Sequence, residues 1–209
     1  LQYLLVQSVL SALIAVYLHT AQQGEDAARR FAFDVWKALT VITTAVVLAI
    51  ELCAPWLARL IAPSYPAVQR TLLSGYLRLF APVLLLLAWI AVFNGLLHAN
   101  KRFIPGEMIS VHQSVFLIGL TALLAKQLGV EVLVIAFFAY NLWNLGYTAI
   151  LSRHYWTISC GNPFQNPAVQ RLLRMMLPLL AGYSLVYVNQ MVDKALVSGL
   201  GGGAVTALS

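Results

Sequence analysis

Charged side chains are scarce in this sequence, since Lys, Arg, Asp and Glu together make up only 10% of its 209 residues. A soluble domain carries about 25% charged residues, so an ordinary soluble globular protein is excluded. Hydrophobic residues supply 61% of the composition, in runs long enough to cross a bilayer. The composition therefore predicts a polytopic membrane protein. The net charge of +6 is accordingly interpreted through the loops, not as a nucleic-acid-binding surface.

Reactive side chains are also few. The two cysteines, Cys53 and Cys160, fall in different segments without metal-ligand spacing, which predicts inert apolar side chains. The four histidines form no i, i+4 pair with a carboxylate, so a zinc site is not expected. A membrane-embedded glycosyl- or acyltransferase would need paired His/Asp or carboxylate groups near an interface, and none is found. The sequence thus favours a transporter over an enzyme.

Six apolar segments are long enough, or nearly long enough, to span a membrane, which takes about 20 residues. They are residues 1–18, 38–57, 79–99, 108–128, 132–151 and 175–200. The runs are continuous and do not alternate with a period of two, which indicates helices and not a barrel. The predicted fold class is all-α, a polytopic transmembrane bundle of about six helices. Because the chain opens in mid-pattern, we expect it to be an internal piece of a longer transporter.

Basic residues are unevenly shared between the linkers. Linkers 19–37, 100–107 and 152–174 hold eight, and the opposite linkers hold four. The eight are Arg29, Arg30, Lys37, Lys101, Arg102, Arg153, Arg171 and Arg174; the four are Arg59, Arg70, Arg78 and Lys126. Cytoplasmic loops carry the excess of Lys and Arg. We therefore expect the first set of linkers to face the cytoplasm.

Polar residues interrupt the first apolar segment on one broad face, at Gln2, Gln7, Ser8 and Ser11. In a lipid-embedded helix such a stripe either holds helices together or lines a watery cavity. Both interpretations remain open from the residues alone. Elsewhere, Asn94, Asn141 and Asn144 are predicted to form hydrogen bonds between helices.

The last apolar segment contains Asn189, Gln190, Asp193 and Lys194. An ionised group at the bilayer centre costs about 2.5–3.5 kcal/mol on insertion scales, so such residues face a cavity or a partner. For Asp193 the spacing favours a buried polar cluster with Asn189 and Gln190. Lys194 either joins this cavity or extends its ammonium group to the interface.

Five stretches occur in an order that resembles the MviN/MurJ family of lipid II flippases. They are LVQSVLSA (5–12), EDAARRFA (25–32), APWLARLIAP (54–63), GLLHANKRF (95–103) and VDKALVS (192–198). The resemblance implies the second to seventh helices of a fourteen-helix, two-lobe exporter. Residues 1–160 would then belong to the N-terminal lobe, and residues 161–209 to an amphipathic linker and the first helix of the C-terminal lobe.

The same resemblance implies a function. Such proteins move a lipid-linked peptidoglycan precursor from the inner to the outer leaflet of the bacterial inner membrane by alternating access. Their partners are this substrate and membrane lipid, with no nucleic acid. Gln2 and Gln7 stand where the family usually has a base and an acid, Lys194 replaces an Arg, and Asp193 matches a sodium ligand, the one cofactor implied. A flippase for another polysaccharide-linked lipid, of the O-antigen type, is the alternative.

Overall fold

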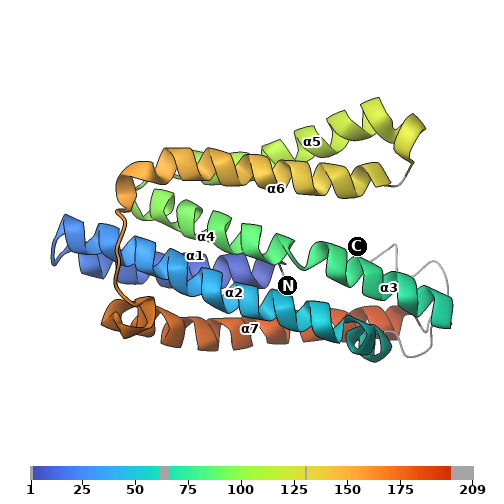
Figure 1. Cartoon of the computed structure of the whole chain (residues 1–209), viewed down its shortest axis with the longest axis horizontal. Coiled ribbons are helices and arrows are strands. Elements are labelled where there is room, and N and C mark those ends of the chain that lie inside the picture. The colour runs from blue at the N-terminus through green and yellow to red at the C-terminus, as the bar shows by residue number, and fades with distance from the viewer. Residues whose placement is uncertain (1, 62–65, 130, 199–209) are drawn as a thin grey trace.

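A computed structural model places residues 2–61, 66–129 and 131–198, and this part of the chain is helical with short turns (Figure 1). The long helices are α1 (Gln2–Ala21), α2 (Glu25–Ile61), α3 (Ala67–Phe80), α4 (Val83–Ala99), α5 (Ile104–Leu128), α6 (Glu131–Ser152) and α7 (Pro167–Ser198). Two 3₁₀ turns, η1 (Arg153–Tyr155) and η2 (Pro163–Gln165), lie between α6 and α7. The predicted all-α membrane bundle is confirmed.

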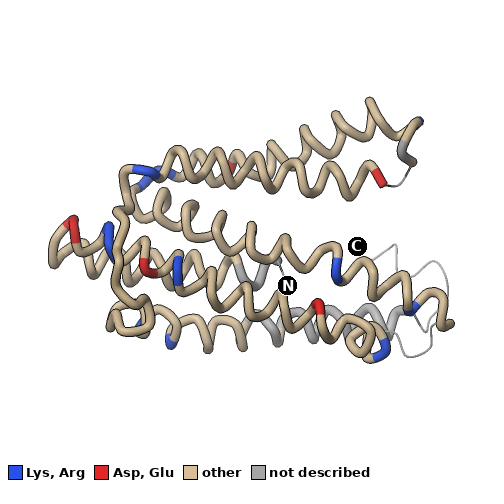
Figure 2. Tube along the Cα trace, in the orientation of Figure 1, with Lys and Arg blue, Asp and Glu red and all other residues tan. Residues whose placement is uncertain are grey.

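Four stretches of the described chain are long and apolar enough to cross a membrane. They are α2, the α3–α4 pair, α5 as far as Gln127, and α6 extended through η1, while α1 contributes a shorter apolar stretch, Val6–Ala21. Figure 2 shows that charged residues gather toward the two ends of the bundle and leave most of the middle uncharged. This distribution fits a hydrocarbon layer across the middle of the bundle, since charges there are costly.

Two helices are longer than the apolar runs that predicted them. The polar stretch after Gly24 is continuous with the second span, so α2 has 37 residues and passes through Pro55. Likewise, α7 begins at Pro167 and runs without interruption into the last apolar segment. Hydropathy marks only the part of a helix that lies in hydrocarbon, whereas backbone hydrogen bonding carries the helix on into the polar region.

The third apolar segment is split, and most of the linker before it is helical. α3 ends at Phe80 and α4 begins at Val83, with a tight turn at Ala81 and Pro82. Pro82 has no N–H to donate to the turn before it, and the N–H groups of Leu84 and Leu85 bond three residues back. Proline accounts for the change of direction between the two helices.

α1 lies at the centre of one layer, in contact with α2, α4 and α7. The α5–α6 hairpin forms a second layer, joined to the first mainly through α6 and α4 (Figure 1). Within its apolar window, none of α5 is buried. Its exposed side chains, such as Val115, Ile118 and Leu123, are apolar, so this surface suits contact with lipid chains.

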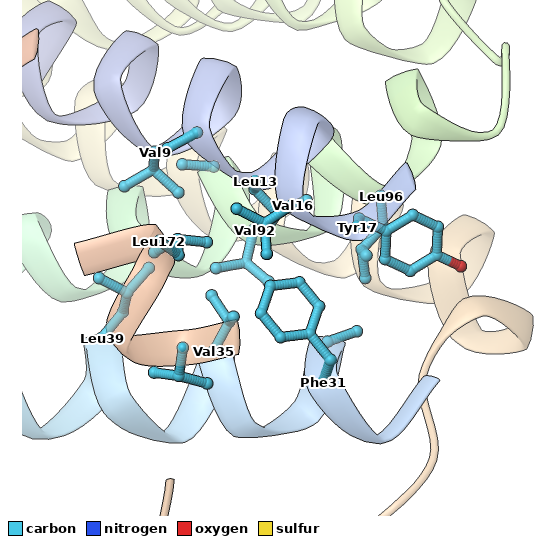
Figure 3. Close-up of a cluster of buried hydrophobic side chains, with 14 of the residues drawn as sticks. Val9, Leu13, Val16, Tyr17, Phe31, Val35, Leu39, Val92, Leu96 and Leu172 are labelled. Carbon is cyan, nitrogen blue, oxygen red and sulfur yellow. The ribbon is translucent and has the colours of Figure 1, made fainter. Parts of the chain in front are cut away.

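The core gathers around the packed face of α1 (Figure 3). Val9, Leu13 and Val16 are at most 3% exposed and recur at helical spacing. The side chains that meet them come from α2 (Phe31, Val35, Leu39), α4 (Val92, Leu96) and α7 (Leu172). Because lipid chains are as apolar as these residues, association here depends on close packing more than on removal of apolar surface from water.

Gly95 marks the tightest point of the α1–α4 contact. A Cβ atom there would lie 3.0 Å from Leu13 Cδ2 and 3.6 Å from Leu13 Cβ. We expect Gly95→Val to destabilise the protein by about 1–3 kcal/mol through overpacking, measured as a lower melting temperature in detergent. Gly119→Val on α5 is the matched control, since nothing lies within 4 Å of a Cβ there. Leu13→Ala should partly rescue Gly95→Val; absence of rescue would contradict the proposed contact.

Candidate functional site

The four polar residues predicted on α1 do not share one environment. Ser8 is fully buried on the packed side, whereas Ser11 is exposed and Gln7 is half-buried. The side chain of Gln2 lies outside the described residues. On a helix Gln7 and Ser11 are one turn apart, so they share the side of α1 that turns away from the core. The structure therefore places two of the four residues on the outer side of α1 and a third against neighbouring helices, and their role in a cavity stays a prediction.

The polar residues of the last apolar segment all lie on the helical backbone of α7. The side chains of Asn189, Gln190, Asp193 and Lys194 lie outside the described residues, so their proposed cavity and cation site stay predictions. At the level of the fold, α7 runs antiparallel to α1 and contacts it (Figure 1). The two polar segments singled out from the sequence thus belong to neighbouring helices.

A buried polar network at one end of the bundle was not predicted. Lys37 Nζ of α2 donates to two carbonyl oxygens of the α6–α7 linker, Ser159 O at 2.8 Å and Gly161 O at 2.6 Å. Asp34 is only 6% exposed, and its Oδ1 lies 2.9 Å from Lys37 Nζ. Its Oδ2 accepts a hydrogen bond of 2.9 Å from Asn166 Nδ2. We call these side chains and carbonyls the linker clamp.

The linker clamp has the features of a structural anchor. Each partner of the Asp34–Lys37 ion pair also holds a residue more than 120 positions away. Asn166 in addition accepts from Ala168 N through Oδ1 at 3.0 Å, at the beginning of α7. The aromatic rings of Phe33 and Trp156 stack nearby, with 5.8 Å between centroids. The clamp therefore fixes both the linker and the start of α7 to α2.

One further polar contact connects α5 with α6. His112 Nδ1 lies 2.8 Å from Asn144 Oδ1, so the predicted hydrogen bond between helices is confirmed for Asn144. Asn141 instead donates to Phe137 O of its own helix at 2.8 Å, and its predicted role is wrong in this structure. Asn94 Oδ1 of α4 is buried with no hydrogen-bond partner among the described residues. It lies against Gly106 of α5, where a Cβ would collide with it and with His98 Nε2.

Within the residues that the structure places, no group of three His, Cys, Asp or Glu side chains could hold a metal ion. Cys53 and Cys160 are both exposed free thiols.

Comparison with known protein families gives a direct match. The family model of the lipid II flippase MurJ matches residues 4–209. The chain belongs to the MurJ family. This family and the apolar helices together identify a multi-pass membrane protein of a flippase family. No solved structure matches the chain.

The MurJ family match does not explain the linker clamp, and its signal in the sequence is slight. Opposite charges at positions 34 and 37 are three residues apart on a helix, which is compatible with an ordinary surface pair. Burial of Asp34 comes from a linker that is remote in sequence. Only the folded chain shows that the pair also bonds to Ser159, Gly161 and Asn166.

We expect Lys37→Met to loosen the α6–α7 linker. The change removes an ammonium group that binds two carbonyls and leaves the Asp34 carboxylate buried without its counter-charge. Hydrogen bonds to charged groups contribute about 1.5–3 kcal/mol, so chymotrypsin should cleave near Trp156 and Phe164 several-fold faster in purified full-length protein. Arg30→Met is the matched control, because Arg30 is exposed on the same helix. Equal cleavage of Lys37→Met and wild type would contradict an anchoring role.

Proposed function

We propose that the full-length protein moves lipid II from the inner to the outer leaflet of a bacterial inner membrane by alternating access. The observation that carries the proposal is the MurJ family match across residues 4–209. The charge bias of the linkers supports its orientation, because the linker-clamp end carries eight basic residues against four at the other end.

We further propose that the unpacked side of α1 lines the transport path. Gln7 and Ser11 lie on this side, while the opposite side is filled by Val9, Leu13 and Val16. A sugar and pyrophosphate headgroup needs polar contacts during its passage, since hydrocarbon offers none. Amide and hydroxyl groups can supply hydrogen bonds without the cost of burying a charge.

In the full-length protein, Gln7→Leu should reduce complementation of a strain depleted of its own lipid II flippase, at unchanged abundance in the membrane. The reason is that Leu keeps the helix and similar bulk but removes both hydrogen-bonding groups. Gln7→Asn retains the amide and is the control, so it should complement better than Gln7→Leu. Full complementation by Gln7→Leu would show that the side chain only supports helix packing.

We propose that Asp193 of α7 binds a sodium ion that favours one state of the transporter. Supporting this are its place in an apolar segment and the resemblance of residues 192–198 to the family's seventh helix. A carboxylate without a counter-ion in such surroundings would tend to take up a proton, whereas a bound cation keeps it ionised. Oxygen ligands of this kind suit hard cations.

Asp193→Asn keeps the size of the side chain and removes its charge. We expect sodium chloride to raise the melting temperature of purified full-length wild type relative to choline chloride, because a ligand of the native state stabilises it. In Asp193→Asn this shift should disappear while the melting curve stays cooperative. Equal sodium shifts in the two proteins would reject a cation site at Asp193.

A further inference from the structure

A cavity of about 370 Å³ lies between the end of α2 and the beginning of α3. Its described lining consists of Pro55, Arg59, Ala67, Arg70, Thr71 and Ser74. We call it the α2–α3 cavity. It lies at the end of the bundle opposite the linker clamp, since α2 runs from one to the other (Figure 1).

The charge of the α2–α3 cavity has one sign. Two of its lining residues are arginines, and no carboxylate is among those that the structure places. The described part of the chain gives neither Arg59 nor Arg70 an ion-pair partner, although its two ion pairs elsewhere are well formed. Two guanidinium groups beside one cavity repel each other unless an anion lies between them. The arrangement is therefore suited to an anion.

Arg70 gives the strongest indication. Its Nε is buried and has no hydrogen-bond partner among the described residues. A buried N–H group that is left unpaired is destabilising, and the planar guanidinium fork matches the oxygens of a phosphate. An anion bound by the other nitrogens of this group and by Arg59 would balance the two positive charges beside the cavity.

The backbone adds a smaller favourable contribution. Ala67, also in the lining, is the first residue of α3, and no side chain caps this end of the helix. The partial positive charge of a helix N-terminus attracts anions. The hydroxyls of Thr71 and Ser74 already donate to Ala67 O and Thr71 O. Recognition would accordingly come from the arginines, with the hydroxyls filling space.

The depth of the α2–α3 cavity indicates which anion it meets. Trp56, next to the lining residue Pro55, is 64% exposed, and exposed Trp on a membrane protein is typical of the headgroup region. The abundant anion at that depth is the phosphate of a lipid headgroup. Arg59 and Arg70 lie at this end, in linkers where the charge bias predicts few basic residues.

We propose that the α2–α3 cavity is a binding site for the phosphate group of an anionic lipid headgroup, with Arg59 and Arg70 as its ligands. The phosphate can belong to a membrane phospholipid such as phosphatidylglycerol or to the diphosphate of a polyprenyl lipid. Either phosphate presents the same charged oxygens to the guanidinium groups of Arg59 and Arg70. The site does not depend on the direction of transport or on a cation at Asp193.

Thermal melts of the purified full-length protein in detergent test the site. The added lipids are phosphatidylglycerol, undecaprenyl diphosphate and, as the zwitterionic reference, phosphatidylcholine. At least one of the two anionic lipids should raise the melting temperature more than phosphatidylcholine does. In the double variant Arg59→Gln/Arg70→Gln, the lipid concentration needed for half of that shift should rise about tenfold or more, because charge-assisted hydrogen bonds are lost.

The matched control is Arg78→Gln/Lys126→Gln, which removes two charges from the same end. Neither residue is among the described lining of the cavity, and Arg78 Nε donates to Glu51 O at 3.3 Å. The control should keep the wild-type lipid response. Response to phosphatidylglycerol assigns the site to membrane lipid, and response to undecaprenyl diphosphate alone assigns it to the cargo. Equal loss in both double variants, or no loss in the cavity variant, would overturn the proposal.

If the cavity variant fails to give a cooperative melt, Arg59→Lys/Arg70→Lys replaces it. This change preserves both charges but removes the planar fork, so a weaker lipid response is expected from loss of paired hydrogen bonds. An unchanged response in the lysine variant would show attraction by charge alone and would overturn the assignment of the two arginines as fork-shaped ligands.

Discussion

Hydrocarbon offers no hydrogen-bonding partners, and this constraint accounts for most of the architecture. Each backbone N–H and C=O inside a bilayer must be paired within the protein. Continuous helices are therefore favoured, because a helix pairs these groups within one segment. The same constraint acts on polar side chains. Thr20, Asn141 and Thr148 each donate to the carbonyl four residues earlier. These residues satisfy themselves locally, which leaves few polar groups free for contacts between helices or with a substrate.

Polar groups that are not satisfied locally are consequently the informative ones. Asp34 and Lys37 meet partners from a remote linker, His112 meets Asn144 across two helices, and Arg70 Nε has no partner among the described residues. The first two contacts hold parts of the chain together. The third group belongs to a residue that lines the α2–α3 cavity. One end of the bundle therefore has polar groups that bond to a remote linker, and the other end has a basic group beside a cavity.

The sequence predicted the order of the apolar helices because length and hydropathy decide it, as at residues 108–128 and 132–151. Of the six expected spans, four described stretches are long and apolar enough to cross a membrane. The helix break at Ala81 and Pro82 was not predicted, because it lies inside the apolar run 79–99 and hydropathy does not sense a missing N–H. The linker clamp was beyond prediction, since Lys37 finds its acceptors at backbone carbonyls, which every residue carries. For α1, one-sided polarity was visible, but which side packs depends on α4 and α7.

The split environment of α1 connects packing with function. Gly95 lets α4 approach Leu13 closely, so the packed side of α1 is filled mainly by apolar contacts, with Ser8 buried among them. On the other side, Ser11 is exposed and Gln7 half-buried. These two residues therefore take little part in packing within the described bundle. The proposed transport path rests on this contrast, because a polar side chain at bilayer depth is favoured where it meets a polar substrate or water.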